Sequence, residues 1–166
     1  MSAPSDLFAR DHLPPRELWP DLLLDPPFDY PERLNCAGEL LDRTIEAGHG
    51  ERTLFHGPGW TYEDFRDRVD RVAGVLTNDL RLVPGERVLL RGPNTPMLAA
   101  CWFGVVKAGG ICVATMPLLR EYELTYTVEK ARVRLALCDA AWADELERTQ
   151  EQTSILENIV LFNVDD

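Results

Sequence analysis

The stretch "KAGG", from Lys107 to Gly110, has the residue types of a phosphate-binding loop, because a lysine stands beside two glycines. Phosphate loops, however, place their glycines before a helix, where free backbone N–H groups and the positive end of the helix dipole meet the anion. Here an apolar helical pattern precedes Lys107, so the lysine and the glycines fall at the negative end of that helix. We therefore predict that "KAGG" closes a helix, with a cation in the last turn and a glycine stop.

The stretch "RGPNTP", from Arg91 to Pro96, lies in a better place for ligand binding. It follows a predicted strand and precedes a predicted helix, which puts it at the carboxyl edge of a parallel sheet, where open α/β folds bind ligands. Asn94 and Thr95 are therefore candidate contacts to a substrate or cofactor. A local explanation competes and is favoured, because Thr95 is a good N-cap and proline suits the first helical position.

Arg120 is the third candidate contact. It follows the strand-ending Pro117 in "TMPLLREYEL" and stands where Ser, Thr or Asp would more naturally cap the next helix. A cation near the positive end of a helix dipole is unfavourable, so the choice of arginine at this position needs an additional explanation. We favour pairing with Glu121 or Glu123 over the alternative, which is contact with an anionic ligand or with another part of the protein.

Several other classes of site find little support. The three histidines are scattered and none has a Ser or Cys nearby in a nucleophile setting, so we assign no catalytic residue. The four cysteines lack metal-ligand spacing and stand among apolar neighbours, so we expect reduced core thiols and no metal site. These residues are His12, His49 and His56, and Cys36, Cys101, Cys112 and Cys138.

The net charge and the hydropathy indicate which classes of binding partner the protein can have. The formal net charge is -11 and no run of Lys or Arg reverses it locally, which disfavours nucleic-acid binding. No apolar run approaches the ~20 residues that span a bilayer, and the first residues lack the pattern of a signal peptide. We therefore expect a cytoplasmic protein that is neither secreted nor inserted in a membrane.

The 166 residues divide into two parts. Residues 1–33 are rich in proline and have no sustained periodicity, so they are predicted to form an extended arm, with Trp19, Phe28 and Tyr30 pinning it to the domain surface. Residues 34–166 are predicted to form one α/β domain. It opens with an amphipathic helix that ends at Gly48 and Gly50 and buries Ala37, Leu40, Leu41, Thr44 and Ile45.

A β-hairpin and a run of βαβ units follow. "TLFHGPGWTY" predicts the hairpin, and Thr61 with Asp64 predicts a capping box on the next helix. Short apolar strands then alternate with helices, which predicts a mainly parallel sheet with helices on both faces. Its central, nearly fully buried strands are expected to include Val88–Leu90, Ile111–Ala114 and Leu135–Cys138. A last strand at Ile159–Phe162 is expected to leave an unpaired edge that favours self-association.

The order of these features resembles the N-terminal part of the AMP-forming acyl-CoA synthetases, the adenylate-forming ligase superfamily. "WTYEDF" resembles the first core motif of that family and "VVKAGGICVATMPL" the second, and the resemblance runs from about Tyr30 to Asp166. Within the family, "YPERLNCAGELLD" and "TMPLLREYEL" resemble the benzoate and 2-aminobenzoate CoA ligases.

The resemblance implies a parent enzyme that joins ATP to a carboxylate with the help of Mg²⁺, giving an acyl-adenylate and pyrophosphate, and then passes the acyl group from AMP to coenzyme A. The family's phosphate loop, ribose-binding Asp and C-terminal lysine match nothing before Asp166, so no catalytic residue is carried over. This chain alone is therefore expected to be inactive and to bind no cofactor of its own, its partners being the rest of the enzyme and a small-molecule carboxylate. The alternatives are a self-contained flavodoxin-like module that binds a nucleotide or another small molecule at "GPNTP", and a non-catalytic interaction domain.

Overall fold

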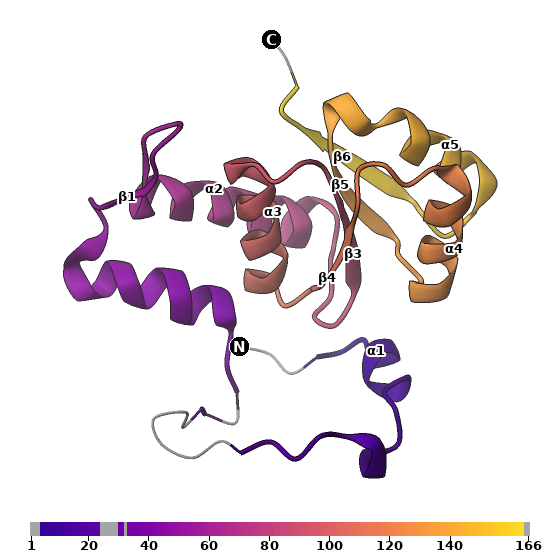
Figure 1. Ribbon diagram of the computed structural model, residues 1–166, viewed down its shortest axis with the longest axis horizontal. Helices are drawn as coiled ribbons and strands as arrows, with labels where there is room; N and C mark the ends of the chain where they lie inside the picture. Colours follow the sequence, from indigo (N-terminus) through magenta and orange to yellow (C-terminus); the bar gives the residue numbers. More distant parts are fainter. Residues whose placement is uncertain (1–3, 24–29, 32, 165–166) are drawn as a thin grey trace.

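Four apolar segments form the sheet at the centre of the protein (Figure 1). The computed structural model describes residues 4–23, 30–31 and 33–164. The strands pair in the order β4-β3-β5-β6, and each pairing is parallel. Their bounds are β3 (Arg87–Arg91), β4 (Ile111–Thr115), β5 (Leu135–Asp139) and β6 (Asn158–Phe162). The predicted α/β class with a parallel sheet is confirmed.

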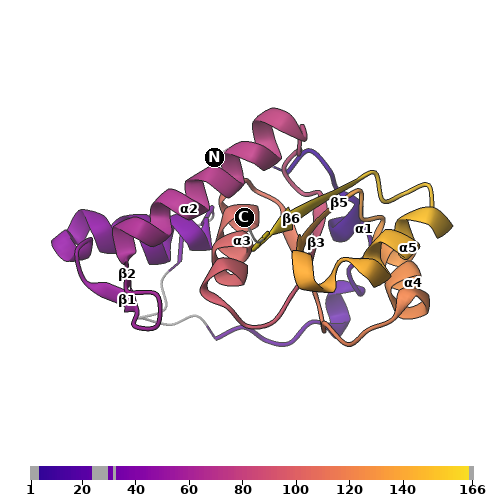
Figure 2. The same cartoon turned by 90° about the horizontal axis from the view of Figure 1, so that it is seen from above.

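Helices cover both faces of this sheet, as Figures 1 and 2 show. The step from β3 to β4 runs one way across the sheet, and the steps to β5 and β6 run the other way. Right-handed crossovers then place α3 on one face and α4 and α5 on the opposite face. In the described residues, no helix has the length and apolarity that crossing a membrane requires. The bounds are α2 (Tyr62–Gly74) with its π-helical continuation η4 (Val75–Asp79), α3 (Pro96–Lys107), α4 (Glu121–Ala131), the 3-10 turn η5 (Ala140–Trp142) and α5 (Asp144–Gln152).

Strand β3 shows how the two faces divide the core. Val88 and Leu90 pack with α3, where Val105 is also buried. Leu89 points the other way and packs with Leu124 of α4. Because both faces of the sheet are covered, consecutive residues of the strand are apolar. The strand therefore lacks the alternation of apolar and polar residues that a half-exposed strand shows. The same division holds along β5, with Leu135 and Leu137 in one cluster and Ala136 and Cys138 in the other.

The expectation that Ile111–Ala114 forms a nearly fully buried central strand is wrong. Strand β4 lies at the edge of the sheet, and Ile111 is 39% exposed. The next strand, β5, pairs with the free side of β3 rather than with β4, so among the described residues only β3 and β5 are flanked by strands on both sides. Strand β6 is the other edge and, within the described ranges, pairs only with β5. Self-association through that edge stays a prediction.

The predicted hairpin and capping box are confirmed. Strands β1 (Thr53–Phe55) and β2 (Trp60–Thr61) pair in the antiparallel sense. At the start of α2, the Asp64 backbone N–H donates to Thr61 Oγ1 at 3.1 Å, and the Thr61 N–H donates to Asp64 Oδ2 at 2.9 Å. Two orphan donors of the helix terminus are thereby satisfied by neighbouring side chains.

The predicted first helix of the domain is present, but its buried side is narrower than expected. Residues 36–49 are helical, including the π-helical turns η2 (Gly38–Asp42) and η3 (Ile45–His49), and Gly48 has a positive φ of 86°. Ala37 and Leu41, one turn apart, are buried, whereas Leu40 is 60% exposed. The expectation for Leu40 is wrong because, in this π-helical turn, the buried side follows the line through Ala37 and Leu41 and leaves Leu40 facing outward.

The N-terminal residues dock at the amino end of the sheet. The backbone N–H groups of Ser5 and Asp6 donate to Pro84 O at 2.8 and 2.9 Å, and Asp6 pairs with Arg87 at 2.7 Å. The Phe8 ring lies under the guanidinium of Arg87, at 4.6 Å, and under that of Arg132, at 5.2 Å. Two short helices follow, α1 (Phe8–Asp11) and the 3-10 turn η1 (Arg16–Leu18).

Of the aromatic residues expected to pin the arm, the two that the structure describes do not make these contacts. Trp19 and Tyr30 are exposed, and Phe28 lies outside the described residues. The indole N–H of Trp19 donates only to Pro14 O, within the arm itself. The division between an arm at residues 1–33 and a domain at 34–166 stays a prediction.

Close contact between α2 and α3 depends on Gly104. A Cβ at this position would lie 2.5 Å from Val72 Cγ1 and 3.2 Å from Val69 O. Gly104→Ala is therefore expected to destabilise the protein by ~1–3 kcal/mol, through overpacking. Gly74→Ala is the matched control, because a Cβ there meets only Asn78 Nδ2 at 3.8 Å, and it is expected to be neutral or to stabilise by up to ~1 kcal/mol. Urea unfolding of both variants checks this, and equal effects would contradict it.

Candidate functional site

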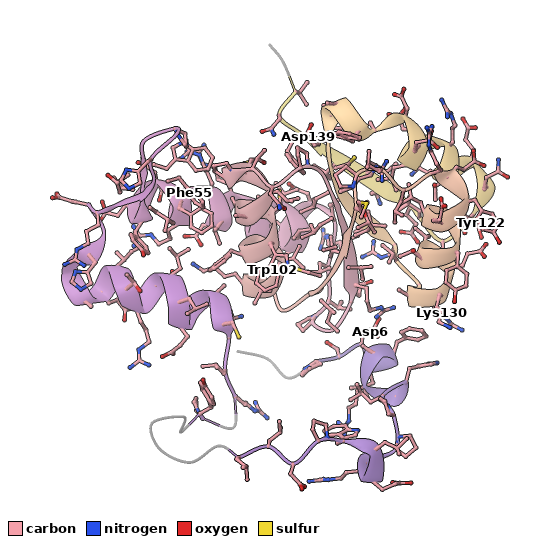
Figure 3. All side chains as sticks on the ribbon, in the orientation of Figure 1. Asp6, Phe55, Trp102, Tyr122, Lys130 and Asp139 are labelled. Carbon is pink, nitrogen blue, oxygen red and sulfur yellow. The ribbon has the colours of Figure 1, made fainter. Side chains whose placement is uncertain are left out.

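The carboxyl ends of β3, β4 and β5 form the edge where open α/β sheets bind ligands. The chain leaves β3 toward α3 on one face, whereas it leaves the neighbouring strands toward α4 and α5 on the other. This divergence is a topological switch point, which creates crevices beside β3. Figure 3 labels Asp139 at this end of the sheet and Asp6 at the opposite end.

Two hollows lie at this edge, one on each face of the sheet. The first has a volume of about 360 Å³ and lies toward α3. The second has a volume of about 240 Å³ and lies toward α4 and α5. Pro117, in the segment after β4, lines both. The first is lined by Leu90, Gly92, Asn94, Leu98, Trp102, Ala114, Thr115, Met116 and Pro117, and the second by Arg91, Pro117, Leu118, Leu119, Arg120, Ala141, Trp142, Asp144 and Glu145.

The three candidate contacts predicted from the sequence all lie at this edge, but they do not line the same hollow. Asn94 lines the first hollow and is exposed. Thr95 acts as the N-cap of α3, because its Oγ1 accepts from the Leu98 N–H at 3.2 Å, and Pro96 is the first helical residue. The local explanation for Thr95 therefore holds in the structure. Contact of Asn94 or Thr95 with a ligand stays a prediction.

Arg120 lines the second hollow and contacts another part of the protein, which was the alternative to a pair with Glu121 or Glu123. Its Nη1 lies 3.0 Å from Glu145 Oε1, across the contact between α4 and α5. The expectation of a side-chain pair with Glu121 or Glu123 is wrong, since Glu123 accepts only from the Arg120 backbone N–H, at 3.0 Å. The partner was out of reach of local reasoning because it belongs to the next helix.

Glu145 places a carboxylate at the N-terminus of α4. Its Oε2 accepts from the backbone N–H of Glu121 at 2.9 Å, and its Oε1 accepts from Arg120 and from Arg148, the latter at 3.1 Å. The backbone hydrogen bond and then the Arg120 contact hold the pKa of Glu145 below its ordinary value. The positive end of α4 is thus already matched by an anion of the chain itself.

Arg91 is another residue at this edge that was not predicted from the sequence. It ends β3 and is 1% exposed, yet its guanidinium makes four hydrogen bonds, all to backbone carbonyls. Removal from water lowers the pKa of Arg91. A charged residue at the end of the apolar run "VLLR" was the signal that could have pointed to it.

Asp139 fills the crevice between β3 and β5. It is buried, its Oδ1 accepts from the Ala141 N–H at 3.1 Å, and its Oδ2 accepts from Asn163 Nδ2 at 2.8 Å. A Cβ at Gly92 would lie 3.0 Å from Asp139 Cβ, so the backbone after β3 passes close against it. Asp139 and the close backbone therefore occupy this crevice, whereas the two hollows beside it remain open.

The stretch "KAGG" closes a helix, as predicted. Lys107 is the last residue of α3, and Gly109 has a φ of 84°. The Lys107 ammonium pairs with Asp42 at 2.8 Å and Asp70 at 2.6 Å. Partial burial disfavours its charged form, but the hydrogen bonds to these carboxylates outweigh it and raise the pKa of Lys107. The amide of Asn35 donates to Val106 O at 2.9 Å, which caps the same helix end.

The cysteines give no sign of nucleophilic or metal chemistry. Burial raises the pKa values of Cys101, Cys112 and Cys138 to about 12, so these thiols stay protonated at neutral pH. Cys36 is exposed, so the expectation of a core position is wrong for that residue. Within the part of the chain that the structure describes, no three His, Cys, Asp or Glu residues lie together as a metal site would need.

Comparisons with known proteins identify what this architecture is similar to. A family model described as "AMP-binding enzyme" matches residues 41–165. Benzoate–CoA ligase of Thauera aromatica is 30% identical over 114 residues, which cover 68% of this chain. Long-chain-fatty-acid–CoA ligase of Bacillus subtilis is 29% identical over 133 residues, which cover 80% of this chain. The chain spans 22% of the length of each of these two relatives.

A solved structure shows the same fold. The anthranilate CoA ligase crystallised with anthranoyl-AMP superposes with a TM-score of 0.73 at 24% identity, over 80% of this chain and 26% of that one.

The first site prediction concerns Arg120. Because its side chain is 78% exposed, Arg120→Ala is expected to lower the free energy of unfolding by at most ~1 kcal/mol, the range of exposed ion pairs. Chemical denaturation of the variant beside the parent chain measures this. A larger loss would mean that Arg120 is more than a surface partner of Glu145.

The free energy of unfolding is expected to depend on pH through Glu145. Because the folded-state pKa of Glu145 lies below the ordinary 4.5, the unfolded chain takes up this proton first as the pH falls. The stability from Glu145 is therefore fully present above about pH 4.5 and is lost as the pH falls through the folded-state pKa. Glu145→Gln is expected to lower stability at neutral pH and to flatten the loss of stability on the acid side.

Denaturation curves measured from neutral pH down to about pH 3 provide the test. Glu147→Gln, on the exposed side of the same helix, is the control and is expected to leave the acid-side slope nearer that of the parent. Identical slopes for Glu145→Gln and the parent would contradict the prediction.

Proposed function

Because the chain belongs to the AMP-binding enzyme family, we propose that it is the N-terminal part of an ATP-dependent, AMP-forming acid–CoA ligase. The match over residues 41–165 is the observation that carries the proposal, since it covers nearly all of the α/β region. Both curated relatives described above are acid–CoA ligases, which supports the same reaction here. A self-contained flavodoxin-like module or a non-catalytic interaction domain is not favoured, because neither explains this match.

The proposed reaction joins a carboxylate to ATP, releases pyrophosphate, and then transfers the acyl group from AMP to coenzyme A. We propose an aryl acid of the benzoate or 2-aminobenzoate type as the substrate, with a fatty acid as the second candidate. Benzoate–CoA ligase among the relatives and the anthranilate enzyme among the solved structures support the aryl acid. The Bacillus subtilis enzyme supports the fatty acid.

The described residues do not fit the triphosphate of ATP with its Mg²⁺. Lys107 is held by two carboxylates at the negative end of α3, and the positive end of α4 already faces Glu145. We therefore assign the nucleotide and metal sites to the rest of the ligase, which is the proposed partner of this region. No chemical step is assigned to a residue of this chain.

What this region contributes is a shaped surface at the carboxyl edge. Asn94 in the first hollow and Arg120 in the second are the proposed contacts to the carboxylate or to coenzyme A, with Thr95 supporting the backbone beside Asn94. The net charge of -11 disfavours binding to nucleic acid or to an anionic membrane, and we propose a cytoplasmic location for the ligase.

The test is carboxylate-dependent exchange of labelled pyrophosphate into ATP. Holding the reactants together is worth ~7–11 kcal/mol of barrier, and the described residues offer no fitting phosphate site, so the 166-residue chain is expected to show no exchange. The longer parent enzyme is expected to show exchange with benzoate, 2-aminobenzoate or a medium-chain fatty acid.

Running both proteins side by side separates the outcomes. Exchange by the isolated chain above a no-protein control would refute the assignment of the nucleotide site to the rest of the ligase. Absence of exchange by the parent with every acid would refute the proposed reaction.

A further inference from the structure

We propose that Arg91 is a positioning residue that fixes the backbone between the two hollows and so sets the shape of the ligand-binding edge. This inference rests on the proposed function for what the edge binds. Its structural part rests only on the contacts of Arg91.

One guanidinium links two separate loops. Its Nε donates to Trp142 O at 2.9 Å, at the end of η5. Its Nη1 donates to Met116 O at 3.3 Å, and its Nη2 donates to Pro117 O at 2.7 Å and to Leu119 O at 3.0 Å. Strand β3 thus holds the segment after β4 and the segment after β5 at the same time.

Arginine suits this task because of its geometry. A planar fork with five N–H donors reaches carbonyls in several directions, whereas a lysine presents three donors from one nitrogen. Burying a charge is costly, and an apolar residue of similar volume is often the more stable choice. The buried Arg91 guanidinium donates its hydrogen bonds to carbonyls of two loops. We therefore infer that its role is to hold these loops in one defined arrangement.

The segment that Arg91 holds is the one that shapes both hollows. Pro117 lines both of them, and the segment leads directly into Arg120 at the start of α4. Thr115 Oγ1 donates to Leu90 O at 3.0 Å, and the Leu119 N–H donates to Met116 O at 3.1 Å, so the whole turn is tied back to the end of β3.

Arg87 provides a matched control on the same strand. It is 7% exposed, and it donates to Ala131 O at 2.8 Å and to Arg132 O at 3.1 Å. The two arginines therefore have similar burial, and both donate to backbone carbonyls, but Arg87 also pairs with Asp6 and lies at the amino end of β3, away from both hollows. A general effect of losing a buried arginine appears in both variants, whereas an effect on the binding edge appears only for Arg91.

The first experiment is amide hydrogen exchange on the 166-residue chain, using Arg91→Lys, Arg91→Met and Arg87→Lys. Arg91→Lys is expected to speed exchange in peptides covering residues 116–121 by about tenfold, with little change at residues 131–133. Arg87→Lys is expected to give the reverse pattern. Arg91→Met is expected to exceed Arg91→Lys, and if it does not fold, the lysine variant decides.

Unchanged exchange at residues 116–121 in Arg91→Lys would overturn the proposal. The proposal would also be overturned if Arg91→Lys and Arg87→Lys both accelerated amide exchange to the same extent throughout the chain.

The second experiment measures the consequence for ligands in the longer ligase. Arg91→Lys is expected to raise KM for the carboxylate or for coenzyme A about fivefold while kcat changes less than about twofold, since the loss is one of binding shape. Arg87→Lys is expected to leave both constants near those of the parent. Unchanged KM values in Arg91→Lys would overturn the role at the binding edge. If the unmodified ligase shows no activity, the proposed function fails, while the exchange experiment still decides whether Arg91 positions the segment.

Discussion

Parallel pairing of β3 with strands on both sides is the constraint on which the rest of the protein depends. A strand covered on both faces and both edges leaves only its two ends near polar groups, and each end carries an arginine. Arg87 meets the N-terminal residues at one end, and Arg91 gathers loop carbonyls at the other. The apolar interior of the sheet and the polar organisation of its ends are thus two results of one strand's position.

The carboxyl edge is organised before any ligand arrives. Glu145 satisfies the start of α4, Asp139 satisfies the turn after β5, and Arg91 satisfies loop carbonyls that would otherwise need water. Asn94 and Arg120 line the hollows with exposed side chains, and they stay the candidate contacts for a ligand. Preorganisation of this kind reduces the ordering that a ligand must impose on binding.

Local sequence signals predicted much of this fold, but they did not predict the strand order or the contacts between residues far apart in the sequence. The Thr61 capping box, the glycine stop at Gly109 and the helix Glu121–Ala131 each depend on residues within a few positions, and each is present. The position of β4 at the edge depends on which side of β3 the later β5 joins, and an apolar strand reads the same in either place. The edge itself was predictable from the strand–helix order, which brought Asn94, Thr95 and Arg120 to it. The partner of Arg120 was not, because Glu145 reaches it only through the packing of two helices.

The docking of Ser5, Asp6 and Phe8 sets an order on folding. Each βαβ unit forms from neighbouring stretches of chain, whereas Ser5 must find Pro84, and Phe8 must find Arg132, across long loops whose closure costs entropy. Their binding surface is complete only when the turn after α4 is in place. We therefore expect residues 5–8 to dock after the sheet has formed, and to detach during unfolding while the sheet remains intact.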